Sequence, residues 1–558
     1  MVKNSKFIKY LLFIGVLILL NIAAEYAWLR IDFTKEKRYT LSEQTKAVLK
    51  QAKKPVTITV FLDGQMPAAF KRLKNATSDL LVDYRRYANV PVNLIYIDPL
   101  KELSAEAQDK VINDLAEIGI KPVAINLKSD AGITQKIIFP MALMEMDGQP
   151  MPVNLLQKSG GPAANYEDNI TYSVQNLEYA FTAALHHLQR GQAPRIGFTE
   201  GHGEPSNLQF YDAISSLSSR FYVGRVDLNL IRKTGLDSLQ VLVIANPKTA
   251  FTEAEKYKIN YFVMKGGKVI WLIDQVQAAL SDLQDGQPRL SVNSQLNIDD
   301  MLFEYGARVN YNLVADANSA LIPVSGGAPG QIELFPWLYF PVLMPDSSVQ
   351  MVKNIDGIRT EFASTVDTIA VKNVEKKVVL RTSDYYKVYQ SPKLLSLQLL
   401  QEQPDAKTWH QPPSVTGVLL EGKFKSVFQN RPVPEGITEP YPVPANSVPT
   451  KMLVIGDGNV FSNQVSATDQ SPFPLGFDRY SQLNYGNKAL LLNVADYFTD
   501  DRPLIALRNK EIKERLLDKM KLKTEKTKWQ LVNSLFPLFL LILLAIFQHY
   551  YRKYKYTK

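Results

Sequence analysis

The sequence predicts a mixed α/β protein whose chain carries one membrane-crossing helix near each end. Two apolar segments, at about 7–24 and 531–547, are long enough to cross the hydrocarbon core of a bilayer, which takes about 17–25 helical residues. Between them, apolar residues alternate between strand spacing and helix spacing, which is typical of parallel α/β sheets. The long middle region must therefore lie on one side of a membrane.

Composition narrows the chemistry of this middle region. The 558 residues include no cysteine, which excludes disulfides, thiolate zinc sites, iron–sulfur clusters and cysteine nucleophiles. The net charge of +9 is not accompanied by any nucleic-acid-binding motif. Much of the basic excess instead flanks the apolar segments, at Lys3, Lys6, Lys9, Lys519, Lys521, Lys523, Lys526, Lys528, Arg552, Lys553, Lys555 and Lys558. We therefore expect contact with a membrane and none with nucleic acid.

The first apolar segment could be a cleaved signal peptide or a retained anchor. A basic start and the small residues Ala23 and Ala24 fit cleavage. Tyr26 and Trp28 follow directly and suit the aromatic belt at a membrane interface. This pattern favours a retained anchor.

The basic residues beside the two spans indicate their orientation only weakly, because they lie on both sides of each span. Lysines before the first span and basic residues after the second place both termini in the cytoplasm. The inner flanks are basic as well, and counting them alone favours the reverse orientation. Because long domains cross membranes largely regardless of their charge, we expect cytoplasmic termini and a middle region outside the inner membrane.

The chain begins with an anchor at 1–29 and a juxtamembrane connector at 30–54, in which Ser42 could cap a helix. Residues 55–158 predict a small α/β domain. Strand patterns at Val56–Val60 and Val92–Ile97 enclose a helical pattern, which predicts a parallel pair with a crossover helix. A further helix and two strands complete an order that could match a thioredoxin-like fold, although without cysteines it has no thiol redox chemistry.

A linker at about 160–170 and a helix that ends at Gly191 lead into a second α/β domain at 171–300. Its strand patterns are Arg195–Thr199, Tyr222–Leu228, Val241–Ala245 and Lys268–Asp274. Thr252 and Glu255 form a capping box for a helix at 253–264. The alternation of strands and helices predicts a doubly wound, flavodoxin-like sheet.

The rest of the chain adds strands before it returns to this sheet. Residues 301–450 are richer in strands and turns, with strand patterns at Arg308–Ala315, Trp337–Leu343, Thr368–Val371, Lys377–Leu380 and Val415–Leu420. Residues 451–500 supply a last strand and a helix that return to the α/β sheet. A charged helix at 501–528 then leads into a transmembrane helix at 529–551.

One loop has residues that could bind a ligand. Glu200, Gly201, His202, Gly203 and Glu204 follow the carboxyl end of a predicted parallel strand and precede a helix. Open α/β sheets bind ligands at such ends, and histidine and carboxylate side chains can act as acid, base or metal ligands.

Asn246 follows a neighbouring strand and completes this candidate site. The other histidines, His186, His187, His410 and His549, have no spacing that pairs them with His202. A structural turn is the simpler interpretation of the loop.

Several enzyme classes are excluded by missing residues. The segment from Gly417 to Lys423 approaches a phosphate-binding loop, but Phe424 replaces the hydroxyl that would hold magnesium. The flavodoxin-like sheet could belong to a glutamine amidotransferase, but that chemistry needs a cysteine nucleophile. The sequence also has no G-x-S-x-G motif of a serine hydrolase. We expect no cofactor and no ATPase activity.

Segments spread over nearly the whole chain resemble one family. They are RIDFTKEKRYTLS after the first span, GFTEGHGE at 197–204, VLVIANPKTAFTEAEKYKINYFVMKGGKVIWLID at 241–274, MLFEYGARVNYNLVAD at 301–316, GVLLEGKFKSVFQNR at 417–431, LVIGDGNVFSN at 453–463, NKALLLNVADYFTDD at 487–501 and IALRNKEIKERLLDKMK before the second span. In order and together with the two spans, they resemble GldG, the auxiliary, substrate-binding-like component of the gliding-motility ABC transporter of Bacteroidetes-type bacteria.

The resemblance implies an inner-membrane protein with a large periplasmic region that acts with a separate permease and a separate ATPase. It also implies an amidotransferase-like α/β core without the catalytic residue, and it carries no catalytic residues over to this chain. The substrate stays unknown. Two other interpretations remain open: a periplasmic scaffold or binding module of envelope or motility machinery, and an enzyme that uses His202 and Glu204.

Overall fold

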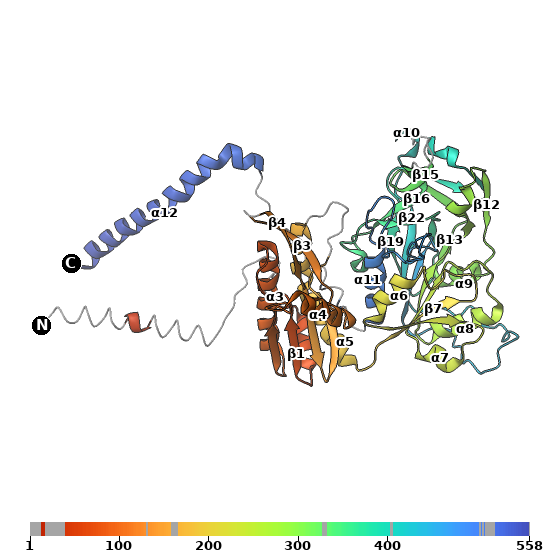
Figure 1. Ribbon diagram of the computed structural model, residues 1–558, viewed down its shortest axis with the longest axis horizontal. Coiled ribbons are helices and arrows are strands. Elements are labelled where there is room, and N and C mark those ends of the chain that lie inside the picture. Colours follow the sequence, from red (N-terminus) through yellow and green to blue (C-terminus); the bar gives the residue numbers. More distant parts are fainter. Residues whose placement is uncertain are drawn as a thin grey trace. The chain divides into compact units, whose positions relative to one another are not determined.

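The computed structural model describes residues 13–16, 40–129, 132–157, 166–325, 332–401, 406–500, Leu504, Leu507 and 519–556. The chain divides into two compact units, Met1–Lys510 and Glu511–Lys558, each of which is described by itself (Figure 1). The expected first span, the start of the connector, most of the linker and most of the charged helix at 501–528 lie outside the described residues. Of the first span, residues 13–16 are described, and they are helical.

The first unit begins with a small α/β domain. After α2 (Glu43–Gln51), which Ser42 caps as predicted, four strands form a sheet in the order β2-β1-β5-β6. Their bounds are Val56–Val60 for β1, Val92–Tyr96 for β2, Met141–Met146 for β5 and Gln149–Asn154 for β6. Strands β1 and β2 are parallel, which confirms the predicted β–α–β unit, and the other pairs are antiparallel.

Helices and one separate hairpin complete this domain. The helices are α3 (Ala68–Tyr87), α4 (Ala105–Glu117) and α5 (Tyr166–Arg190), and the hairpin pairs β3 (Val123–Ser129) with β4 (Gly132–Ile138). Apolar residues of α3 recur at helical spacing and bury Phe70, Leu73 and Leu81 in the same core as Val56 and Ile58 of β1. The core extends beyond the predicted 55–158, because α2 and α5 pack into it; α5 thus belongs to this domain and not to the predicted domain at 171–300. A second, smaller cluster contains Phe61 and Phe139.

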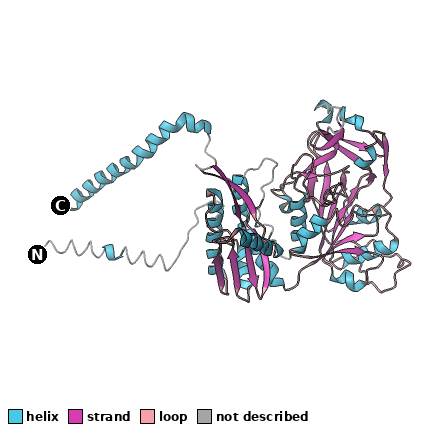
Figure 2. Ribbon diagram, viewed as in Figure 1, coloured by secondary structure: helices cyan, strands magenta, loops and turns pink. Residues whose placement is uncertain are grey.

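A ten-stranded sheet forms the centre of the larger domain (Figure 2). Five strands run parallel in the order β8-β7-β9-β10-β23. They are β7 (Arg195–Glu200), β8 (Tyr222–Asp227), β9 (Val241–Ala245), β10 (Lys268–Leu272) and β23 (Thr450–Ile455). In chain order this is 2-1-3-4-5, the strand order of flavodoxin-like sheets.

Antiparallel strands extend the sheet beyond β23. They are β22 (Val415–Gly422), β19 (Val374–Arg381), β16 (Ile332–Pro345) and β15 (Ser319–Ser325), and β17 (Ile358–Arg359) also pairs with β16. The predicted return of Lys451–Ile455 to the α/β sheet is thus confirmed, and β22 joins the return strand to the β-rich part.

The parallel strands are apolar throughout because both faces of the sheet are covered. Leu242, Ile244 and Trp271 face one core, which α7 (Lys233–Ser238), α8 (Glu253–Met264) and α9 (Asp299–Tyr305) share. The alternate strand residues face the opposite core, which α6 (Tyr211–Ser218) and α11 (Asn487–Thr499) share. The predicted capping box of Thr252 and Glu255 begins α8.

Short paired strands and single-turn helices fill the β-rich part. They are β11 (Val276–Gln277), β12 (Arg289–Asn293), β21 (Lys393–Leu395), β13 (Ala307–Val309), β18 (Val366–Thr368), β14 (Asn312–Asp316), β20 (Tyr386–Gln390), η1 (Leu280–Leu283), η2 (Gln350–Val352), η3 (Leu397–Gln401) and α10 (Ala406–Trp409). The strand predicted at Thr368–Val371 is wrong, because β18 ends at Thr368, where its pairing with Ala307 ends. Asn373 then turns the chain with a positive φ of 62°.

The second unit contains one long helix, α12 (Lys519–Tyr556). Its segment Thr527–Lys555 has a mean hydropathy of 2.3 and is the one helix in the described part of the chain that is long and apolar enough to cross a membrane. Trp529 stands near one end of this segment, and Tyr550 and Tyr551 stand near the other, as aromatic residues do at membrane interfaces.

Candidate functional site

The candidate loop lies at the carboxyl end of β7, between strands β8 and β9. This is the position where the strand order reverses and where such sheets bind ligands. Gly201 and Gly203 adopt positive φ values of 106° and 79°, so the loop turns sharply on both sides of His202. The carbonyl oxygen of His202 accepts hydrogen bonds from the amides of Lys248 and Thr249, at 2.6 and 3.0 Å. The loops that follow β7 and β9 are therefore joined.

The imidazole of His202 is enclosed by two carboxylates and an aromatic ring. Its Nε2 lies 3.1 Å from Oε1 of Glu255, and its Nδ1 lies 3.6 Å from Oε1 of Glu204. The ring of Phe251 stacks on it at a centroid distance of 4.0 Å. The side chains of His202, Glu204 and Glu255 are 5%, 1% and 2% exposed, so the cluster is sealed from solvent.

The two carboxylates determine the charge of this cluster. Burial by itself lowers the pKa of His202, but the negative charges of Glu204 and Glu255 beside its two nitrogens outweigh it, so the pKa of His202 is raised above its ordinary value of 6.5. Burial raises the pKa of Glu204, but the hydrogen bond to His202 and further hydrogen bonds lower it by more. The arrangement stabilises a buried imidazolium between two carboxylates.

Asn246 belongs to a second group of polar residues, which follow β9 and β23. Its side chain donates from Nδ2 to Oδ1 of Asn459 at 2.8 Å, while its own Oδ1 is buried without a hydrogen-bond partner. A Cβ atom on Gly458 would lie 2.5 Å from the Asn246 side chain. This close approach requires glycine at 458 and fixes the loop after β23 against the loop after β9.

Two buried aspartates stand beside this group. Oδ1 of Asp274, which follows β10, accepts from the amide of Gly458 at 2.6 Å, and its Oδ2 lies 3.1 Å from Nζ of Lys248. Burial raises the pKa of Asp274, which the charge of Lys248 partly offsets. Burial and then the charge of Asp274 raise the pKa of Asp457 well above its ordinary value. Both carboxyl groups are therefore shifted toward their neutral forms.

The predicted site residues thus separate into three places. His202 and Glu204 meet Glu255, whereas Asn246 meets Asn459. Glu200 is about half exposed and pairs with Arg225 at 3.3 Å, and the two glycines only shape the turn. Sequence reasoning did not include Glu255, Asp274, Asp457 or Asn459 in the site, although the last three directly follow apolar strand patterns.

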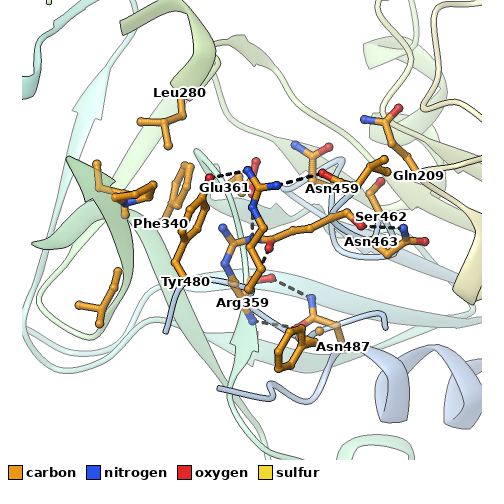
Figure 3. A pocket seen from close by; sticks show the side chains of 18 of the residues that line it. Gln209, Leu280, Phe340, Arg359, Glu361, Asn459, Ser462, Asn463, Tyr480 and Asn487 are labelled. Carbon is orange, nitrogen blue, oxygen red and sulfur yellow. Dashed lines mark hydrogen bonds and ion pairs between the residues drawn. The ribbon is translucent and has the colours of Figure 1, made fainter. Parts of the chain in front are cut away.

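A pocket of about 390 Å³ opens beside Asn459 (Figure 3). Its lining comes from the loops after β23, from β15 and β16, from Arg359 of β17 and Glu361 after it, and from the turns η1 and η3. Figure 3 shows the side chains of Arg359, Glu361 and Tyr480 near its centre, with Phe340 and Leu280 on one side. No sequence pattern predicted this pocket, because its residues come from segments that are far apart in the chain.

The described ranges contain no group of three or more histidine and carboxylate side chains arranged to hold a metal ion. The charged and hydrogen-bonding side chains that line the pocket support the binding of a ligand.

Two family models match the chain. Residues 193–494, just over half of the chain, match the family described as an ABC-type uncharacterized transport system, and these residues span the large sheet from β7 to α11. The chain belongs to this family of ABC transporter auxiliary components. Residues 35–145, in the small α/β domain, match a domain of unknown function.

Other comparisons find more distant similarities. An uncharacterized protein of Borreliella burgdorferi is 20% identical over 534 residues, which cover 93% of this chain and 90% of the relative. Among solved structures, the mmIFT52 N-terminal domain has 15% identity and a TM-score of 0.31, and covers 55% of this chain and 99% of its own. A putative ThuA-like protein from Bacteroides uniformis has 12% identity and a TM-score of 0.27, covering 56% of this chain and 94% of its own.

Proposed function

We propose that this chain is a membrane-anchored, non-catalytic auxiliary subunit of an ABC-type transporter, and that it works with a separate permease and a separate ATPase. The observation that carries the proposal is the family match over residues 193–494. The family is one of transport systems. Because the segment at 417–423 lacks the hydroxyl of a phosphate-binding loop, we assign ATP hydrolysis to another subunit.

The long apolar helix supports attachment to a membrane. The segment Thr527–Lys555 has 29 residues and measures about 44 Å at 1.5 Å per residue, more than the roughly 30 Å of hydrocarbon that a span must cross. Together with the first span it would hold the large domain at the inner membrane. We place both termini in the cytoplasm and the domain in the periplasm.

The buried cluster supports a non-catalytic role. A general acid or base must come within about 2.6–3.2 Å of a substrate atom, but both nitrogens of His202 face carboxylates and its side chain is only 5% exposed. We therefore propose that His202 and Glu204 join the loops after β7 and β9 to α8. The enzyme interpretation has less support than the auxiliary one.

The finer assignments are also proposals. The 2-1-3-4-5 order of the parallel strands supports a flavodoxin-like, amidotransferase-like core, and the order β2-β1-β5-β6 supports a thioredoxin-like small domain. The quoted segments that resemble GldG support a role in gliding motility. The alternative function is a periplasmic scaffold or binding module of envelope machinery, which the pocket beside Asn459 favours.

Affinity purification of the full chain from its native membrane tests the proposal. We expect a multi-spanning permease and an ATPase to be recovered with it in fixed ratio. The double variant His202→Gln and Glu204→Gln should recover the same partners, provided that it folds. Recovery of envelope proteins without permease and ATPase would favour the scaffold. If the folded double variant recovers the same partners but the transporter no longer functions, the interpretation as an enzyme that uses His202 and Glu204 would be favoured.

A further inference from the structure

The pocket beside Asn459 has one polar side and one apolar side. The polar side includes the guanidinium groups of Arg359 and Arg479 and the hydroxyl of Ser462. The apolar side is built from side chains of η1, β15, β16 and η3, among them Leu280 and Phe340 (Figure 3). Its volume of about 390 Å³ lies in the range of small-molecule sites, which is about 300–1,000 Å³. The two-sided lining fits a small ligand that is itself polar at one end and apolar at the other.

The charges on the polar side are not fully paired. Arg359 donates to Oε1 of Glu361 at 2.7 Å, yet its Nε is buried without a hydrogen-bond partner. Arg479 donates to the carbonyl oxygen of Val465 at 3.2 Å and to the hydroxyl of Tyr480, and in the described part of the chain it forms no ion pair within 4.0 Å. The pocket therefore presents a guanidinium that no carboxylate contacts directly.

The amide side chains of the pocket are mostly occupied. Asn463 donates to the carbonyl oxygens of Leu208 and Gln464, and Asn487 donates to those of Arg359 and Val460. These amides hold the loops and are not available to a polyhydroxylated neutral ligand. In contrast, the hydroxyl of Ser462 is buried without a partner. Ser462 and Arg479 therefore keep donors for a ligand, while the carboxylate of Glu361, which also lines the pocket, is paired with Arg359.

We propose that this pocket binds a small ligand in which a carboxylate adjoins an apolar group, as at the C-terminal residue of a peptide or in an N-acylated amino acid. The carboxylate pairs with Arg479, because a guanidinium offers parallel N–H donors that match the two carboxylate oxygens. Ser462 supplies a further donor, and the apolar group packs against Leu280 and Phe340. This inference concerns the chain alone and stands whether or not it works with a permease.

Calorimetric titration of the full chain in lipid nanodiscs tests the proposal. The probes are N-acetyl-leucine, its neutral amide, and an N-acetylated tripeptide that ends in leucine. We expect the acid to bind about tenfold more tightly than the amide, because hydrogen bonds to a charged group are stronger than neutral ones. Tighter binding of the tripeptide would assign the site to chain termini, and tighter binding of the single residue would assign it to small acids.

Three variants locate the binding. Arg479→Gln should remove the preference for the acid, and Leu280→Trp should weaken the binding of acid and amide alike by filling the apolar side. Arg72→Gln removes an exposed arginine of α3 in the small domain and should change neither. If Arg479→Gln does not fold, Leu280→Trp tests the location of the site: unchanged binding of the acid in this variant would overturn the proposal.

The proposal is overturned by equal binding of acid and amide, by no binding of the acid up to about 10 mM, or by tighter binding of a neutral sugar such as maltose. A preference for the acid that persists in folded Arg479→Gln overturns it as well.

Discussion

At the scale of residues, the molecule places charged side chains where water cannot reach them. His202 is held between Glu204 of its own loop and Glu255 of α8. Removing one member of a buried ionic group leaves the others without compensation, which costs about 3–5 kcal/mol. The cluster should therefore matter for the stability of the large domain.

His202→Gln should destabilise the large domain by about 3–5 kcal/mol, because two buried carboxylates lose their cation. The midpoint of urea unfolding, followed by tryptophan fluorescence, measures the loss. The exposed His410 offers a matched control, and His410→Gln should leave the midpoint unchanged. An unchanged midpoint in His202→Gln would contradict the assignment of an ionic cluster.

The same residue predicts how stability depends on pH. The pKa of His202 is raised in the folded state, so its contribution is complete below the ordinary pKa of 6.5 and is lost as the pH rises through the raised folded value. Unfolding midpoints of the unmodified chain should fall over that interval above pH 6.5. In His202→Gln the fall should be absent, and an equal fall in both proteins would point to another group.

At the scale of elements, the carboxyl ends of the parallel strands are joined loop to loop. The loop after β9 meets the loop after β23 through Asn246 and Asn459, and Asp274 binds the amide of Gly458. The sequence identified these strands because β9 and β10 are uninterrupted apolar runs, which is typical of strands covered on both faces. It could not reveal which loops touch, because nothing local in a loop specifies a partner some 200 residues away.

The site residues that the sequence did not reveal are also brought together by contacts between distant segments. The capping box of Glu255 was predictable from its spacing to Thr252, but one oxygen of that carboxylate also faces His202, which lies 53 positions earlier. The pocket was not predictable at all, since Arg359, Ser462 and Arg479 meet only after the antiparallel strands extend the sheet. Local sequence patterns predicted the helices and strands, whereas the His202 cluster and the pocket depend on tertiary packing.

Gly458→Ala should destabilise the fold by about 1–3 kcal/mol, the usual cost of forcing extra atoms into a packed interior. Its Cβ atom would lie 2.5 Å from Asn246. Gly224→Ala is the matched control, because a Cβ atom there meets nothing within 4 Å. Thermal unfolding of the two variants should separate them, and equal midpoints would show that the loop after β23 moves aside easily.

Helix α12 should be sufficient to hold the chain in a membrane. In a chain without residues 1–29, Leu540→Arg places a charge near the middle of the apolar segment, which costs about 2.5–3.5 kcal/mol of insertion free energy. The variant should become extractable by alkaline carbonate, whereas Leu540→Phe should stay in the membrane pellet. Full retention of Leu540→Arg would indicate another means of attachment.

At the scale of the whole molecule, the sequence suggests two spans with one large region between them, and the absence of cysteine offers a direct way to test the orientation. A cysteine introduced at an exposed site is the only thiol in the chain. The side of the membrane on which it reacts with a charged maleimide then reports the topology.

Thr468→Cys, in an exposed loop of the large domain, should react with an impermeant maleimide in intact spheroplasts. Lys555→Cys, at the end of α12, should react only after the membrane is permeabilised. Labelling is read from the mass or gel shift of the purified chain. The opposite pattern would place the large domain in the cytoplasm and reverse the proposed topology.

The order of strands in the large sheet also has a consequence for synthesis. The last parallel strand, β23, pairs with β10, yet about 180 residues separate them in the chain. At about 5–20 residues per second, a ribosome needs roughly 10–35 s to supply the missing strand. During that time β10 has an open edge, and open edges invite pairing with other chains. We therefore expect the unfinished sheet to be open to pairing with other chains until the return strand arrives.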